Sequence, residues 1–265
     1  MKKIFISADI EGVCGIADWA ETDLANPQSA WFRTQMTKEV AALCEAANES
    51  GVEEIFVKDA HGSGRNIVPD MLPRNVKLMR SWTRDPFSMM AGLDPSFEAA
   101  LFVGYHSAVA TAGNPLAHTM NTENVELSVN GRVASEFLLN AYTAAYFGVP
   151  SVFVSGDRLL CESAGELVPG IATVAVSEGR GNASISINPA LALELIKAKA
   201  LAALSGGPAS PLELPSAFKI KTRYRNHHMA YRASFYPGAK LESPVEVSFK
   251  SRDWKDVITF LSFTL

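Results

Sequence analysis

The alternation of short apolar segments with helix-forming segments constrains the fold of this chain most. Segments with the composition of buried strands lie at 3–8, 54–58, 76–79, 100–104, 150–155 and 172–176. Segments typical of helices lie at about 26–49, 135–147, 157–164 and 189–204, and a short helix is expected to open at Asp85–Pro86. Strands that alternate with helices are typical of a mostly parallel, doubly wound sheet flanked by helices. We therefore predict an α/β fold.

A candidate linker that begins at residue 206 suggests how the chain divides. The stretch 206–215 is rich in glycine and proline, which interrupt helices and strands. We predict an α/β metal-binding catalytic domain over residues 1–210. Residues 211–265 are expected to form a smaller C-terminal portion, either a subdomain or an extension of the same domain. Strands are expected there near 218–222 and 245–249, and a helix from about Asp253.

Composition and charge exclude several classes of protein. The 265 residues include 24 Lys+Arg and 28 Asp+Glu, which give a net charge of −4. Of all residues, 48% are hydrophobic, a fraction typical of globular proteins. Without a basic cluster we expect no nucleic-acid partner. Acidic residues interrupt the apolar N-terminus before a signal peptide forms, and no run is long enough for a membrane span. Three scattered cysteines favour a reducing compartment, so we expect a cytoplasmic protein.

Two acidic residues, Asp9 and Glu11, follow the first predicted strand directly. Their spacing of two lets both side chains point to one face. Carboxylates that lie so close repel each other unless a cation lies between them. The pair therefore suggests a divalent metal site, with a solvated strand end as the alternative.

Three histidines and one further acid complete the set of polar candidates. His61 and His106 follow predicted strands, His118 lies in a predicted loop, and Glu136 begins a predicted helix. Each alone has an ordinary interpretation: a turn or buried histidine, or an acid that complements a helix dipole. Together with the acidic pair they form a His/carboxylate set that suits zinc and is large enough for two ions. The residues alone therefore favour a metallohydrolase.

The motifs that contain these residues occur in a recognisable order. They are Asp9–Gly12, Asp59–Asn66, Gly104–His106, Ala117–Thr119, and Val129–Gly131 followed by Ser135–Glu136 and Asn140–Ala141. In order and spacing this series resembles the DppA-type D-aminopeptidases. The resemblance extends over roughly the first 150 residues, whereas the C-terminal third carries no motif.

The resemblance implies a zinc-dependent aminopeptidase that hydrolyses short peptides with an N-terminal D-amino acid. Two zinc ions per subunit are expected, with Asp9, Glu11, His61, His106 and Glu136 as ligands and Asp9 as the bridge. His118 is expected to be the catalytic residue. The family also assembles into a ring-like decamer that encloses its active sites, so a homo-oligomer is expected.

Other interpretations of the same residues remain open. The ligand set does not report stereochemistry, so an amidase or a peptidase for L-peptides would use the same site. A non-catalytic small-molecule binding protein is a third alternative, against which the additional His118 argues. Asp59 either orients a ligand or caps a turn, and Cys14 is expected to be a buried bystander. His227 and His228 are adjacent and are assigned to a surface or an interface.

Overall fold

A seven-stranded sheet forms the centre of the protein, which is described by a computed structural model over residues 1–207 and 209–265. The strand order is β3-β2-β1-β4-β7-β8-β9. The strands are β1 (Lys3–Ala8), β2 (Glu54–Asp59), β3 (Val76–Met79), β4 (Ala99–Tyr105), β7 (Ser151–Asp157), β8 (Ala172–Arg180) and β9 (Ala183–Ser186). Neighbouring strands are parallel except β8 and β9, which form an antiparallel pair. The predicted α/β fold with a mostly parallel sheet is confirmed.

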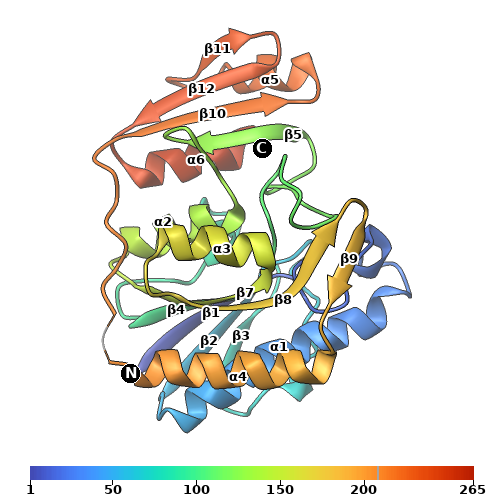
Figure 1. Cartoon of the computed structure of the whole chain (residues 1–265). Helices are drawn as coiled ribbons and strands as arrows, with labels where there is room; N and C mark the ends of the chain where they lie inside the picture. Colours follow the sequence, from blue (N-terminus) through green and yellow to red (C-terminus); the bar gives the residue numbers. More distant parts are fainter. Residues whose placement is uncertain (208) are drawn as a thin grey trace.

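Helices cover both faces of this sheet (Figure 1). They are α1 (Ser29–Glu49) and α4 (Pro189–Ser205) on one face, and α2 (Glu136–Tyr146) and α3 (Arg158–Leu167) on the other. Because side chains alternate along a strand, Ile4 and Ile6 pack in the core beside α1 and α4, while Phe5 packs in the opposite core. Burial on both faces explains why the strands are continuously apolar.

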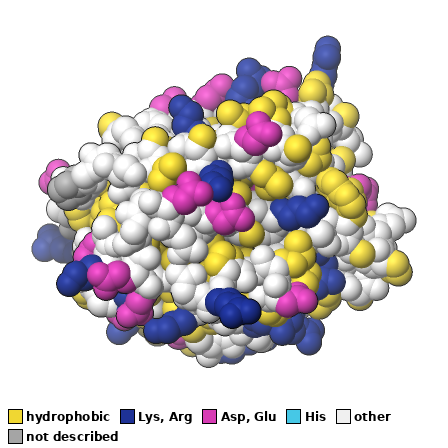
Figure 2. Space-filling view, turned by 90° about the horizontal axis from the view of Figure 1, so that it is seen from below, with side chains coloured by type: hydrophobic (Ala, Val, Ile, Leu, Met, Phe, Trp, Pro, Cys, Tyr) yellow, Lys and Arg dark blue, Asp and Glu magenta, His cyan; other side chains and the backbone are white. Residues whose placement is uncertain are grey.

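The outer face formed by α1 and α4 carries charges of both signs. Lys197 of α4 pairs with Glu45 and Glu49 of α1, at 3.1 and 2.8 Å between nitrogen and oxygen. Figure 2 shows this side of the molecule, where basic and acidic side chains are interspersed among hydrophobic ones. The described side chains of this face therefore form no single-signed patch that would attract a polyanion. Within the described part of the chain, no helix is long and apolar enough to cross a membrane.

A second, five-stranded sheet lies beyond α2 and α6 (Trp254–Thr264) (Figure 1). Its order is β11-β12-β10-β5-β6, with β5 (Asn124–Val129), β6 (Arg132–Val133), β10 (Phe218–Tyr224), β11 (Lys240–Ser243) and β12 (Glu246–Ser251). Helix α5 (His227–Ala233) follows β10. The pairing of β10 with β5 joins strands from both sides of residue 210, so the division there stays a prediction. Residue 208 of the predicted linker lies outside the described residues.

The described residues also include three short 3-10 helices: η1 (Trp19–Glu21), η2 (Pro69–Met71) and η3 (Ser88–Met90). The last one replaces the short helix that the sequence predicts from Asp85–Pro86. The Asp85 carboxylate accepts a hydrogen bond from the Phe87 N–H at 2.8 Å. This local turn delays the helix until Ser88.

The chain order of the large sheet reverses between β1 and β4. From β1 the chain adds β2 and β3 on one side, and then β4, β7 and β8 on the other. In such sheets, ligands bind in the crevice at the carboxyl ends of the strands beside this reversal. Asp9 and Glu11 follow β1, His61 follows β2, and His106 follows β4. Four candidate residues therefore lie at the expected edge.

The segments that leave β1 and β4 approach each other backbone to backbone. Asp9 N–H donates to the Val103 carbonyl at 2.9 Å, and Gly12 N–H donates to the Gly104 carbonyl at 2.8 Å. Gly104 has a φ of 71°, and a Cβ there would collide with the carbonyl of Asp9. A Cβ at Gly12 would collide in the same way with the Tyr105 carbonyl. Glycine at both positions therefore permits the close approach.

Candidate metal centre

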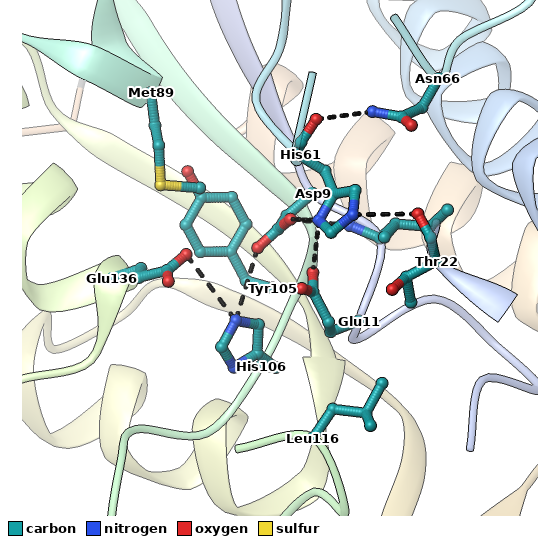
Figure 3. A network of polar contacts seen from close by, with 12 residues as sticks. Asp9, Glu11, Thr22, His61, Asn66, Met89, Tyr105, His106, Leu116 and Glu136 are labelled. Carbon is teal, nitrogen blue, oxygen red and sulfur yellow. Dashed lines mark hydrogen bonds and ion pairs between the residues drawn. The ribbon is translucent and has the colours of Figure 1, made fainter. Parts of the chain in front are cut away.

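All six candidate side chains come together at this edge of the sheet. Asp9, Glu11, His106 and Glu136 are no more than 4% exposed, whereas His61 and His118 are partly exposed. Figure 3 shows the side chains of Asp9, Glu11, His61, His106 and Glu136 converging from different segments. The convergence places three carboxylates and three imidazoles in one buried cluster.

Asp9 lies between two groups of ligand atoms (Figure 3). On one side, His61 Nδ1 lies 3.3 Å from Asp9 Oδ1 and 3.0 Å from Glu11 Oε2. On the other, His106 Nε2 lies 3.6 Å from Asp9 Oδ2 and 3.7 Å from Glu136 Oε2. Each group thus has its own histidine and glutamate and uses a different oxygen of Asp9. This arrangement suits two cations with a bridging carboxylate.

Backbone carbonyls orient the rings of these two histidines. His61 Nε2 lies 3.1 Å from the Thr22 carbonyl oxygen, and His106 Nδ1 lies 2.9 Å from the Ser107 carbonyl oxygen. A carbonyl can only accept a hydrogen bond, so these nitrogens donate. In the neutral rings, His61 Nδ1 and His106 Nε2 then present lone pairs to the carboxylates. Histidines that bind metals are commonly oriented in this way.

The electrostatics of the cluster also call for a cation. Burial and the charge of Glu11 raise the pKa of Asp9 well above its usual range. Burial opposes ionisation of Glu11, but the charges of the neighbouring histidines, that of His61 first, outweigh it and hold the pKa of Glu11 well below its usual range. Among the described residues, Glu11 Oε2 and His106 Nε2 have no hydrogen-bond partner although both are buried. These unpaired nitrogen and oxygen atoms can act as metal ligands, and zinc binds both types.

Glu136 is positioned by its helix and by the loop that precedes it. It is the first residue of α2, whose N-cap Ser135 accepts a hydrogen bond from Leu138 N–H at 3.1 Å. Met120 N–H donates to Glu136 Oε1 at 2.6 Å, which leaves Oε2 beside His106. Met120 has a φ of 68°, in the left-handed region that a residue with a side chain adopts only at a cost.

His118 is placed differently from the other two histidines. Its Nδ1 lies 3.0 Å from the Leu116 carbonyl oxygen, so Nδ1 donates and Nε2 of the neutral ring is free. Nε2 lies 3.6 Å from Glu136 Oε1 and 3.9 Å from Glu11 Oε1, and the ring stacks on His106 at 4.4 Å between centroids. Glu11, His106 and His118 form a third possible ligand group. Because Nε2 of the neutral ring donates no hydrogen bond, it is also available to accept a proton.

Asp59 supports the loop that carries His61 rather than the imidazole ring. Its buried carboxylate accepts hydrogen bonds from Asn66 N–H at 2.6 Å and Ile67 N–H at 2.8 Å, and from the Asn66 side-chain amide at 2.9 Å. The same amide donates to the His61 carbonyl at 2.7 Å. Of the two interpretations of Asp59, the contacts favour the capping role.

Two other groups singled out in the sequence lie outside the cluster. Cys14 is buried, its thiol donates to the Ile187 carbonyl at 3.1 Å, and burial raises its pKa to about 12. It is therefore the buried bystander that was expected. His227 and His228 begin α5, are exposed, and belong to none of the candidate ligand groups among the described residues.

A cavity of about 640 Å³ opens beside the cluster. Asp9, Glu11, His61, His118 and Glu136 form part of its wall. The remaining wall includes apolar side chains from separate segments, among them Trp19, Trp82, Phe87, Leu139 and Leu261. A space of this size suits a small ligand held by a few polar groups.

Several groups that shape the site were not identified from the sequence. The carbonyls of Thr22, Ser107 and Leu116 and the N–H of Met120 are backbone groups, which every residue type offers, so no sequence signal marks them. Asn140 also lines the cavity. It belongs to one of the recognised motifs, but that motif gave it no role.

Comparison with known proteins places this geometry in a family. The model of the D-aminopeptidase family matches residues 1–263. A D-aminopeptidase from Bacillus subtilis (strain 168) is 31% identical over 254 residues, which cover 95% of this chain and 92% of the relative. A solved structure described as the Zn-dependent D-aminopeptidase DppA from Bacillus subtilis, a self-compartmentalizing protease, has a TM-score of 0.91 and 30% identity. That alignment covers 98% of this chain and 95% of the other.

Proposed function

The chain belongs to the D-aminopeptidase family, and from this premise we propose that it hydrolyses short peptides with an N-terminal D-amino acid, using two zinc ions. One observation carries the proposal. Asp9 lies between two groups of ligand atoms, each with its own histidine and glutamate, at the wall of a cavity. A single structural metal would require only one of these groups.

The proposed ligands are Asp9, Glu11, His61, His106 and Glu136. We assign Glu11 and His61 to one ion, His106 and Glu136 to the other, and Asp9 to both. Zinc, when bound, lowers the pKa of water and polarises a carbonyl group. The buried, unpaired oxygen of Glu11 and nitrogen of His106 support this assignment.

His118 is the proposed catalytic residue. Its hydrogen bond to Leu116 fixes the ring so that Nε2 lies beside Glu11 and Glu136 at the cavity wall. A free imidazole nitrogen there can accept a proton and later return it to the departing amine. The stacked ring of His106 and the edge contact with Trp19 hold the imidazole in this orientation.

The stereochemistry, the assembly and the cellular location also belong to this proposal. The relatives are named D-aminopeptidases, and one is described as self-compartmentalizing. We extend both descriptions to this chain and propose a homo-oligomer, specifically a ring-like decamer. A cavity of about 640 Å³ supports short peptides as substrates. We propose a cytoplasmic location on the basis of the three free cysteines.

Replacing His118 with asparagine tests the proposal. We expect the zinc-loaded protein to hydrolyse D-alanyl-D-alanine faster than L-alanyl-L-alanine. The variant should retain its zinc and lose at least about 100-fold in kcat, because general acid–base catalysis contributes that much. The matched control is His228→Asn, on the exposed surface of α5, which should change neither quantity.

Three results would contradict parts of this account. Unchanged turnover in the His118 variant would remove its catalytic role, and loss of zinc would make it a ligand. Faster hydrolysis of the L-peptide would replace the proposed substrate class. If neither peptide is hydrolysed by the zinc-loaded protein, an amidase or a binding protein becomes the better interpretation.

A further inference from the structure

Asn140 lines the cavity one helical turn beyond Glu136. Both residues belong to α2, and their spacing of four places them on the same side of the helix. Asn140 is buried, with 5% of its surface exposed. A buried amide at this position must satisfy its hydrogen-bonding groups inside the protein or with a ligand in the cavity.

A chain of hydrogen bonds fixes the orientation of this amide. The Ser7 hydroxyl donates to the Met89 carbonyl at 3.0 Å, and its oxygen lies 2.6 Å from the Tyr105 hydroxyl. Because Ser7 has only one proton, Tyr105 must donate to Ser7. Tyr105 therefore accepts the hydrogen bond from Asn140 Nδ2 at 2.9 Å. The carbonyl at the end of the chain can only accept, so the direction of every bond is determined.

The second proton of the amide is also directed inward. Asn140 Nδ2 lies 3.3 Å from the thioether sulfur of Met89, a weak acceptor. Figure 3 shows Met89 and Tyr105 beside Glu136. Among the described residues, no group donates a hydrogen bond to Asn140 Oδ1. Both N–H groups are thus used inside the protein, and the amide oxygen is the group left for a ligand.

We propose that Asn140 Oδ1 binds the free amino group of the substrate, and that Tyr105 and Ser7 are positioning residues that hold this oxygen toward the cavity. The inference rests on the proposed function and extends it to a residue that recognises the peptide's N-terminus. An oxygen that can only accept selects a donor.

The test compares Asn140→Leu with Tyr105→Phe and the double variant. Leucine has a similar shape but no acceptor, so KM for D-alanyl-D-alanine should rise about tenfold or more. Tyr105→Phe should raise KM by a smaller factor, because the amide becomes free to turn. The double variant should match Asn140→Leu alone, since Tyr105 acts only through Asn140. Zinc content should be unchanged throughout, and Asn48→Leu on the exposed face of α1 is the control.

Binding measurements separate this inference from the proposed function. With zinc-loaded proteins, Asn140→Leu should weaken the binding of D-alaninamide about tenfold and leave that of propionamide, which lacks the amino group, unchanged. This comparison holds even if the wild type hydrolyses no peptide, a result that would contradict the proposed function alone. The inference would be overturned if Asn140→Leu weakened the binding of both amides equally or left that of D-alaninamide unchanged. It would also be overturned if Asn140→Leu and Tyr105→Phe had independent effects on KM.

Discussion

Replacing Glu39 with glutamine should remove a loss of stability that develops as the pH rises. Glu39 lies on α1 with no exposed surface. Its Oε1 accepts hydrogen bonds from Cys14 N–H at 3.0 Å and from the Gln35 amide at 3.1 Å. Its Oε2 is buried and has no hydrogen-bond partner among the described residues. Burial raises the pKa of this carboxyl from 4.5 to about 7.

The sign and size of the effect follow from this shift. Between pH 4.5 and about 7 the folded protein binds more protons at Glu39 than the unfolded chain does. The stabilising contribution is therefore present below pH 4.5 and is lost as the pH rises through about 7. Relative to low pH, the raised pKa of Glu39 should lower the free energy of unfolding by about 3 kcal/mol at pH 8.5, and by less than about 1 kcal/mol at pH 5.

Urea unfolding at the two pH values measures the effect directly. Glutamine does not titrate, so the free energy of unfolding of Glu39→Gln relative to wild type should rise by about 2 to 3 kcal/mol between pH 5 and pH 8.5. Any constant cost of the unpaired amide cancels in this comparison. Glu45→Gln, an exposed acid on the same helix, is the control and should show no such change. An unchanged difference between the two pH values would refute the reasoning.

Two further substitutions test the support of the site. Gly104→Ala should destabilise the protein by about 3 kcal/mol or more, because it adds a collision with the Asp9 carbonyl to the cost of a φ of 71°. Gly148→Ala has a similar φ of 73° and open space around it, so thermal unfolding should show only about 1 to 2 kcal/mol; equal losses would contradict the role of the close approach. Asp59→Asn should cost about 2 to 4 kcal/mol by denaturant unfolding and weaken zinc binding in calorimetry, since asparagine keeps only one of the two oxygens that accept hydrogen bonds from residues 66 and 67. Unchanged zinc affinity would separate the loop from the metal centre.

Much of the fold could be predicted because parallel strands are buried on both faces. Segments such as 100–104 and 150–155 are continuously apolar, and this signal survives without tertiary information. The pairing of β10 with β5 depends on segments far apart in the sequence, which local composition does not report. The β8–β9 hairpin and α5 were missed for a related reason: both β9 and α5 are short, β9 has no buried residue, and α5 buries only Ala230 and Ala233.

The proximity of the candidate residues could be predicted more completely than the secondary structure around them. Asp9, Glu11, His61 and His106 follow strands, and strand ends in such a sheet meet at one edge. His118 lies in a loop, so its residue type and its motif, and not a strand end, indicated that it belongs with the others. The role of Asp59 depended on the backbone N–H groups of residues 66 and 67. Contacts of this kind follow from loop conformation and not from residue type.

The zinc content of the purified protein tests the central claim most directly. Elemental analysis should give about two zinc ions per chain in the wild type, since Asp9 lies between two groups of side chains that could each hold a metal ion. Asp9→Ala removes the shared ligand and should reduce the content to less than one, whereas the exposed Asp94→Ala should leave it at two. A wild-type protein that holds no zinc when zinc is offered at neutral pH, or an Asp9→Ala protein that retains two ions, would contradict the account.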